Sequence, residues 1–321
     1  MVTRVGDISA PASPPRTLTL TTTSMEDIPC PVSPSHPYLP PELERIIFET
    51  AALARRRTIP RLMLVAGRVK LWIEPLLYEV IMLSGAAFEE RDSLGLPHFN
   101  IDILLKAIKR KPPLFFQNAV QHLFLEHRIL AKELDVICTA CTGVVNLFHF
   151  NTGLHNLAAL RNLHHLRRLT LSFPEFLLFW RSDGTHPVLN NLTHLELYAG
   201  PIHKLIDFPS LMSRLTHISL NFIPDDKPLQ TALCESTHLQ CIVFLSEEWA
   251  DEQALTACGL LLADLRFVCV HLHTPFRVDW LYGAVLRDNY WTLADAFITA
   301  RREGKIDRFR CIVSDLESDS K

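Results

Sequence analysis

Apolar residues recur along the middle of the chain in the pattern L-x-x-L-x-L, with 22 to 26 residues between copies. This period and pattern are typical of leucine-rich repeats, in which alternate residues of a short strand point into the core and the rest of the repeat returns as a helix or loop. The pattern therefore predicts an α/β solenoid with a parallel sheet. The central apolar residues of the copies are Leu123, Leu147, Leu169, Leu195, Ile218, Ile242 and Val268.

Further elements extend the series at both ends. A strand pattern centred on Val80, with Leu77 and Met82, predicts an atypical first repeat with an insertion. At the other end, Asp288 is expected to cap a last helix that ends before Gly304 and shields the open apolar edge of the last repeat. Other helices are expected at Ile101–Lys109, Lys227–Glu235 and Glu252–Asp264.

A short helical region precedes the repeats. Apolar positions at helical spacing predict an amphipathic helix after Pro40 and Pro41. A second short helix is predicted after Thr58, and a third at Arg68–Ile73. Helices this short bury little apolar surface, so they need a partner or a neighbouring domain. The apolar stripe of the first helix consists of Leu43, Ile46, Ile47, Thr50, Ala51 and Ala54.

These patterns divide the chain into consecutive parts. Residues 1–37 are rich in Pro, Ser and Thr and are predicted to be disordered. The rest is predicted to comprise a helical module at 38–76, an atypical first repeat at 77–119, repeats at 120–275, a helical cap at 276–305 and a polar tail at 306–321.

Composition and charge narrow the possible functions. A net charge of −3 favours neither nucleic acid nor an anionic membrane surface as a partner. No apolar run could span a bilayer and no secretory signal is recognisable, so we expect a cytoplasmic or nuclear location. Phosphate-binding and common hydrolase motifs are absent, so we predict no enzymatic activity and no cofactor. The isolated pair Cys138 and Cys141 is interpreted as buried thiols, because no second ligand pair accompanies it.

The fifteen histidines raise the question of a metal site. Three of them immediately precede the central apolar residue of a strand, a position that faces away from the core. We interpret them as residues of the repeat surface and predict no metal site. The candidates for a partner-binding repeat face are His122, His194, Glu196, His217 and Ser219.

The helical region resembles an F-box. Leu-Pro-Pro-Glu-Leu at 39–43, Ile-Ile-Phe at 46–48, Leu-Met-Leu-Val at 62–65 and Trp-Ile-Glu-Pro-Leu-Leu at 72–77 follow the order and spacing of that family. With its repeats, the chain resembles F-box-like proteins that carry degenerate leucine-rich repeats. This resemblance implies docking on the Skp-type adaptor of a Skp–cullin–F-box ubiquitin ligase, with the repeats presenting an unknown protein substrate. The adaptor-binding positions it implies are Leu39, Pro40, Leu43, Ile46, Phe48, Leu62, Val65, Trp72 and Pro75.

Two functions remain open at this point. In the first, the chain is a substrate receptor that tethers a target protein close to the ligase and needs no catalytic residue. In the second, it is a leucine-rich-repeat scaffold without a ligase link, and the helical module only caps the solenoid. Exposure distinguishes them: Leu43, Ile46, Phe48 and Trp72 packed on the first repeat would leave no docking stripe, whereas an exposed apolar patch implies a partner. An enzyme would instead require titratable residues that converge in a pocket.

Overall fold

A computed structural model describes residues 39–84, 93–126, 129–150, 157–183, 186–198, 212–246 and 252–314. The predicted disordered segment 1–37 and residues 315–321 of the predicted polar tail lie outside these ranges. The residues from Glu42 onwards form one compact unit, and Leu39 and Pro40 belong to the segment before it. Within the described ranges, no helix is both long enough and apolar enough to cross a membrane.

The predicted three-helix region is present. It consists of α1 (Pro41–Ala54), α2 (Ile59–Leu62) and α3 (Gly67–Ile73), followed by the 3-10 helix η2 (Glu74–Leu77). Proline occupies the first turn of each of α1, α2 and η2, where its missing N–H leaves no hydrogen bond unmade. The small core of this helical module is formed by Ala52, Ile59, Val69 and Ile73, with Phe48, Leu62 and Trp72 half-buried around it.

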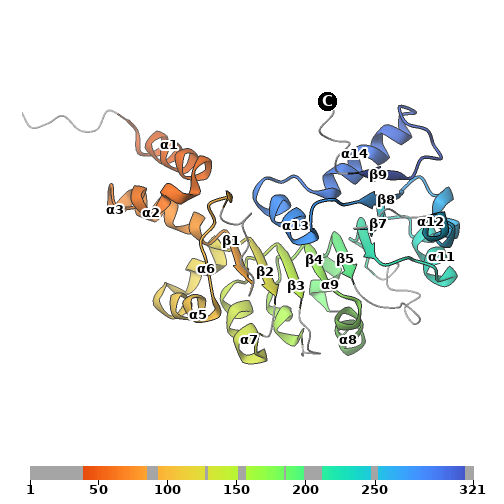
Figure 1. Ribbon diagram of the computed structural model, residues 1–321. Helices are drawn as coiled ribbons and strands as arrows, with labels where there is room; N and C mark the ends of the chain where they lie inside the picture. The colour runs from red at the N-terminus through yellow and green to blue at the C-terminus, as the bar shows by residue number, and fades with distance from the viewer. Residues whose placement is uncertain are drawn as a thin grey trace, which may run out of the picture. The chain divides into compact units, whose positions relative to one another are not determined.

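Nine strands form one parallel sheet in chain order (Figure 1). The register aligns the central apolar residues of the repeats from Leu123 on β2 to Ile242 on β7. The parallel sheet that the repeats predicted is therefore confirmed, and the chain is an α/β protein. The strands are β1 (Val80–Leu83), β2 (His122–Glu126), β3 (Asn146–Phe150), β4 (Arg168–Ser172), β5 (His194–Tyr198), β6 (His217–Asn221), β7 (Cys241–Ser246), β8 (Phe267–His271) and β9 (Ile312–Ser314).

One face of the sheet, face A, packs against the segments that return between strands. Alternate strand residues such as Leu195 and Leu197 are fully buried there. The expected helices at Ile101–Lys109 and Lys227–Glu235 are confirmed, whereas the one expected at Glu252–Asp264 is divided near Gly259, whose φ of +46° lies in the left-handed region. The elements on this side are α5 (Ile101–Arg110), α6 (Pro113–Ala119), α7 (Ala131–Ala140), η3 (Leu157–Asn162), α8 (Phe173–Asp183), α9 (Pro187–Asn191), α11 (Lys227–Glu235), α12 (Glu252–Ala257) and η4 (Gly259–Ala263).

The opposite face of the sheet, face B, is covered by the two C-terminal helices. These are α13 (Phe276–Val285) and α14 (Tyr290–Arg302), which lie on the side of the sheet away from α7 and α8 (Figure 1). Helix α13 packs on an apolar cluster over β1–β3 that includes the stacked rings of Phe124 and Phe148, 4.1 Å apart. Helix α14 packs on a second apolar cluster over β7–β9. The helical cap predicted for the edge of the sheet thus lies across a face of it.

The strand phase predicted at the two ends of the repeat series is wrong by one residue. Ile81, not Val80, pairs with Leu123, and Val268 pairs with Val243 rather than with Ile242. Val80 and Val268 consequently face α13 and α14, not face A. Both end strands are apolar on both faces, so hydrophobic alternation cannot specify which residues point to which side.

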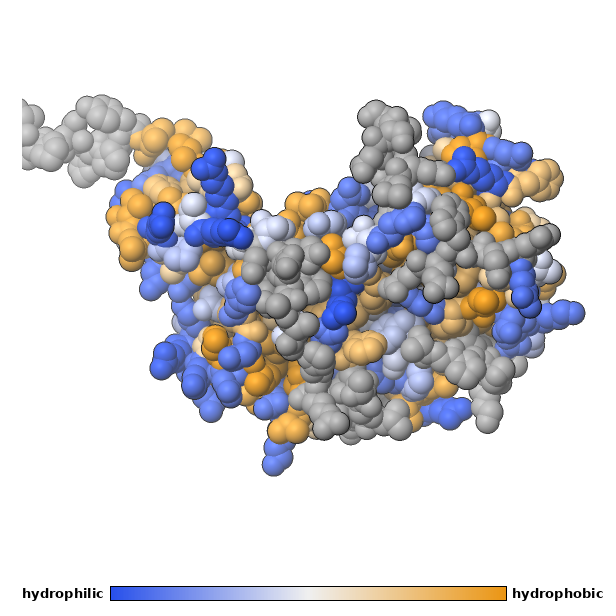
Figure 2. All heavy atoms as spheres, viewed as in Figure 1, coloured by the Kyte–Doolittle hydropathy of each residue, from blue (hydrophilic) through white to orange (hydrophobic). Residues whose placement is uncertain are grey.

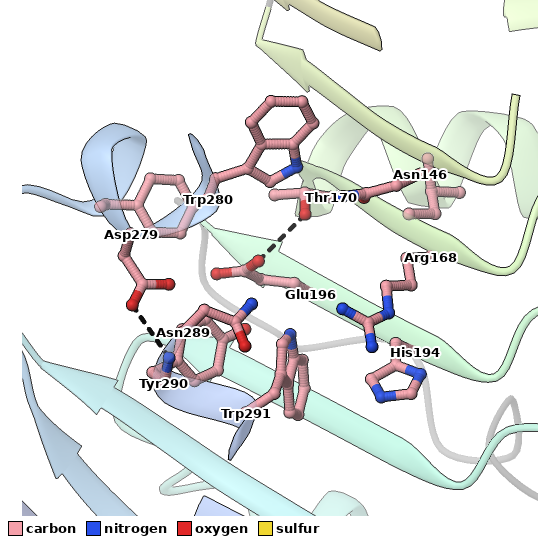
Figure 3. Close-up of a pocket in the computed structure, with 12 residues that line it drawn as sticks. Asn146, Arg168, Thr170, His194, Glu196, Asp279, Trp280, Asn289, Tyr290 and Trp291 are labelled. Atoms are coloured by element: carbon pink, nitrogen blue, oxygen red, sulfur yellow. Dashed lines mark hydrogen bonds between the residues drawn. The ribbon is translucent and has the colours of Figure 1, made fainter. Parts of the chain in front are cut away.

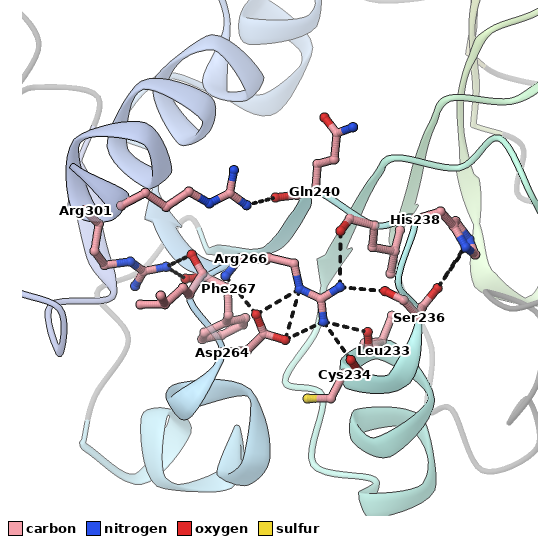
Figure 4. A network of polar contacts seen from close by, with 12 residues as sticks. Leu233, Cys234, Ser236, His238, Gln240, Asp264, Arg266, Phe267 and Arg301 are labelled. Carbon is pink, nitrogen blue, oxygen red and sulfur yellow. Dashed lines mark hydrogen bonds and ion pairs between the residues drawn. The ribbon is translucent and has the colours of Figure 1, made fainter. Parts of the chain in front are cut away.

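Two arginines, the buried Arg301 and the half-buried Arg266, hold the C-terminal part together through backbone carbonyls (Figure 4). Arg301 of α14 donates to the carbonyl oxygens of Leu265 and Phe267, each at 2.6 Å, and so ties α14 to the start of β8. Arg266 donates to the carbonyl of Cys234 at 2.7 Å, at the open C-terminal end of α11, and pairs with Asp264. Carbonyls at helix and strand ends lack regular partners, and each guanidinium satisfies several of them at once.

A histidine in a leucine position of face A has a specific partner. His149 on β3 occupies the last apolar slot of its repeat, and its Nδ1 lies 3.3 Å from Oε1 of Glu175 on α8. Both side chains are about 2% exposed. The Glu175 carboxylate also accepts a hydrogen bond from the Ser172 hydroxyl at 2.8 Å. The weak match of this repeat to the pattern is thus compensated by a buried polar pair.

We expect His149→Leu to lower the free energy of unfolding by about 1–3 kcal/mol, because it removes the buried polar neighbour of the Glu175 carboxylate. The double variant His149→Leu/Glu175→Leu should be destabilised less than the sum of the single variants, since an apolar pair of similar volume fits the same site. Urea unfolding of the three variants measures this coupling. Strictly additive losses would contradict the pairing.

Candidate functional site

Polar side chains occupy the middle of face B, between its two apolar clusters. We call this set the polar strip: Asn146, Arg168, Thr170, His194, Glu196, His217 and Ser219, from β3 to β6. They alternate with the apolar residues of face A, so each strand places them on one side. The loop and first residues of α14 cover them with Asn289, Tyr290 and Trp291, and α13 adds Asp279 and Trp280 (Figure 3).

Glu196 is the acidic residue of the polar strip, and its pKa is strongly raised. It is 4% exposed and accepts a hydrogen bond from the Thr170 hydroxyl at 2.9 Å (Figure 3). Burial, together with the nearby carboxylate of Asp279, raises the pKa of Glu196 to about 8, although the contacts with Thr170 and Tyr290 act in the opposite direction. The carboxyl group is therefore largely protonated at neutral pH.

The cavity next to Glu196 is very small. Its volume is about 20 Å³, which is enough for one water molecule but not for an organic substrate. Polar atoms of its lining that are buried without a hydrogen-bond partner within the described chain include Oε1 of Glu196, the hydroxyl of Tyr290 and Nε1 of Trp280. One water could bridge these groups. The site thus has the electrostatics of a buried polar network and too little room for a ligand.

Two histidines of face B, His194 in the polar strip and His122 beside it, are neutral at physiological pH. Burial lowers the pKa of His122 to about 4 and that of His194 to about 2, and neighbouring cationic groups add to the effect. The His194 ring stacks on the His217 ring with centroids 4.1 Å apart, and Trp291 places an edge against both. These contacts hold α14 onto β5 and β6.

The predicted repeat-face residues lie together on face B, but helices α13 and α14 cover them. Glu196, His217 and Ser219 are buried, and His122 and His194 are half-buried. Alternation along the strands predicted their common face correctly, but not the helices that lie on it. While α13 and α14 occupy these positions, a target protein cannot contact the buried members of the set.

The predicted adaptor-binding residues divide into exposed and half-buried groups. Leu39, Pro40, Leu43, Ile46 and Val65 are exposed, whereas Phe48, Leu62, Trp72 and Pro75 are half-buried. All six residues of the predicted α1 stripe are exposed, because α1 packs on the module core through Phe48 and Ala52 instead. Sequence reasoning missed three more exposed apolar side chains of this module: Leu53, Leu64 and Leu71.

Burial raises the thiol pKa of each cysteine within the described ranges. Cys138 at the end of α7 and Cys141 after it are fully buried, as predicted, and burial raises the pKa of the Cys141 thiol to about 12. The seven cysteines in the described ranges are all free thiols.

Comparisons with protein-family models and with curated protein sequences found no match. What the fold defines is the class of the chain, an α/β protein with a nine-stranded parallel sheet alternating with helices.

Titration of Glu196 should appear in the pH dependence of stability. The folded chain keeps a proton on Glu196 up to about pH 8, whereas the unfolded chain releases it near pH 4.5. The folded state binds more protons between these values, so this group lowers the free energy of unfolding as the pH rises from about 4.5 to 8. Glu196→Gln, which keeps a hydrogen-bonding partner for Thr170, should gain at least about 1 kcal/mol relative to wild type between pH 5 and 8.

Urea unfolding at several pH values tests this prediction. The exposed substitution Glu235→Gln on α11 controls for the loss of one carboxylate. Parallel stability profiles of wild type and Glu196→Gln would show that the folded chain does not hold this proton.

Proposed function

We propose that the chain is a protein-interaction adaptor, a substrate receptor of a Skp–cullin–F-box ubiquitin ligase whose helical module docks on a Skp-type adaptor protein. The observation that carries the proposal is the exposure of the apolar stripe of α1. The order of the motifs at 39–77 supports it, because their resemblance to an F-box places adaptor-binding positions on this stripe.

An amphipathic helix normally turns its apolar stripe towards the core. In α1, Leu43, Ile46 and Ile47 are 47%, 56% and 52% exposed. Leu64 and Leu71 add exposed apolar side chains to the same module. Figure 2 shows apolar surface over the region of α1–α3. A concentration of exposed apolar side chains of this kind is typical of an interface with another protein.

The module is attached to the sheet by a different set of contacts. Arg56 donates to the Glu79 carboxylate at 2.8 Å, and Lys111 pairs with Glu74 at 2.6 Å. These contacts involve η2 and the residues around it, not the stripe of α1. The stripe is thus free while the module is fixed to the first repeat.

The alternative, a module that only caps the solenoid, requires its apolar residues to pack on the first repeat. Phe48 and Trp72 instead pack against Ala52, Val69 and Ile73 within the module itself. Phe48 and Trp72 therefore stabilise the module while the apolar stripe of α1 stays exposed. This arrangement favours the substrate receptor over the solenoid cap.

The target-binding surface of the proposed receptor needs a different location from the one expected. The polar strip, predicted as part of the target-binding face, lies beneath α13 and α14. In the proposed function, the target protein contacts surfaces that these helices leave uncovered, and the helical module alone carries the docking on the adaptor.

We expect the double substitution Leu43→Asp/Ile46→Asp to reduce binding of a purified Skp-type adaptor protein by more than about 100-fold, because two charges would be buried against an apolar groove. Both side chains are exposed in the free chain, so its stability should change little. Titration of the full-length chain with the adaptor, by calorimetry or a sensor surface, measures the affinity.

Ile103→Asp on α5 is a matched control, because Ile103 has the same 47% exposure as Leu43 but lies outside the module. It should bind the adaptor like wild type. No binding by the wild-type chain, or equal binding by the double variant, would remove the case for the receptor.

A further inference from the structure

We propose that His217 on β6, Cys241 on β7 and Asp295 on α14 form a divalent-metal site suited to zinc. The three side chains come from three different elements and meet at the edge of the polar strip. The inference is independent of the adaptor proposal, since it concerns a different end of the sheet and different residues.

The ligand atoms are already gathered. Nε2 of His217 lies 3.1 Å from Oδ1 and 3.3 Å from Oδ2 of Asp295, and one ligand atom from each of the three residues lies within 4.8 Å of the other two. In a tetrahedral zinc site the ligand atoms are about 3–4 Å apart, given zinc–ligand bonds of about 2.0–2.3 Å. The His217–Asp295 pair meets this spacing, and the Cys241 sulfur needs to approach by about 1 Å.

The chemistry of the set fits a dication. An imidazole, a thiolate and a carboxylate are the three side-chain ligands that zinc uses, and together they supply two negative charges. The one strongly exposed member is Asp295, whose side chain is 53% exposed, whereas His217 is about 10% exposed and Cys241 is fully buried. Solvent can thus enter on the side of Asp295 and occupy the fourth coordination position.

The surroundings of His217 match those of a metal-binding histidine. Its other ring nitrogen, Nδ1, lies 2.7 Å from the Thr216 hydroxyl, which can donate to the Thr193 carbonyl at 3.1 Å. With the hydroxyl oriented in that way, Nδ1–H donates to Thr216 and Nε2 keeps its lone pair for a metal. A partner that fixes the second ring nitrogen in this manner is common behind zinc ligands.

Without a metal, the other tautomer lets Nε2–H donate to Asp295, and the thiol of Cys241 has no part in that bond. A metal would favour the tautomer that carries the ring proton on Nδ1, and the Cys241 thiol would release its proton to solvent and bind as a thiolate. Because the ligands join α14 to β6 and β7, the ion would fasten the helix that covers face B.

The test uses the full-length chain, freed of metal with a chelator and then titrated with zinc alone. Wild type should bind one zinc ion per chain, and Asp295→Asn, which preserves size and exposure, should bind it at least about tenfold more weakly. With cobalt in place of zinc, wild type should show thiolate-to-metal charge-transfer absorption, and Cys241→Ser should lack it. Zinc should raise the thermal unfolding midpoint of wild type and not that of Cys241→Ser.

Cys138→Ser is the matched control, because Cys138 is as fully buried as Cys241 but lies on α7. It should bind zinc and cobalt like wild type. Failure of the wild-type chain to bind zinc would overturn the proposal, and so would unchanged binding by Asp295→Asn, which as an exposed substitution is expected to fold whether or not Cys241→Ser does.

Discussion

The architecture depends on covering both faces of a parallel sheet. Strands connected by returning helices bury one face automatically, but the other face gains cover only if some other part of the chain supplies it. Here α13 and α14 do so, with Trp280 over the apolar end formed by β1–β3 and Trp291 over the histidines of β5 and β6. Arg301 makes this cover specific, because its guanidinium fits backbone carbonyls at the start of β8 that an apolar side chain could not satisfy.

Covering face B changes the chemistry of the residues beneath it. On an open sheet, Glu196 and His194 would be hydrated and would titrate normally. Under α13 and α14, Glu196 keeps its proton and His194 loses its second ring proton, so both side chains are uncharged. Neutral polar groups cost far less to bury than ions, so Glu196 and His194 can lie beneath the helices. The same cover withdraws these residues from a partner, so the proposed function depends on the exposed apolar side chains of the helical module.

Sequence periodicity predicted the elements that have one buried face. The helices at 101–110 and 227–235 and the central strands were located correctly because their polar and apolar positions alternate with the right period. The phase of β1 and β8 was predicted wrongly because both of their faces are apolar.

Helix α13 was not located individually, since Val278, Asp279, Trp280 and Leu281 are all buried in succession and leave no one-sided stripe. The three residues of β9 are too short a segment to produce any periodic signal. The proximity of Cys241 to Asp295 could not be inferred either, since only the packing of α14 brings them together.

The size of the helical module constrains how the proposed receptor would work. Only four of its side chains form a fully buried core, too few for an independently stable domain, so the module relies on its attachment to the sheet. That attachment is short: two residues, Tyr78 and Glu79, separate η2 from β1, and Arg56 bridges the junction.

A docked adaptor would therefore be held by a stiff connection to the repeats rather than by a flexible linker. In a tethering mechanism a stiff connection confines the bound target to a narrow range of positions. The effective concentration of the target is raised at sites within that range, and sites outside the range are not reached. The exposed stripe and the rigid junction are thus complementary requirements of the same proposed function.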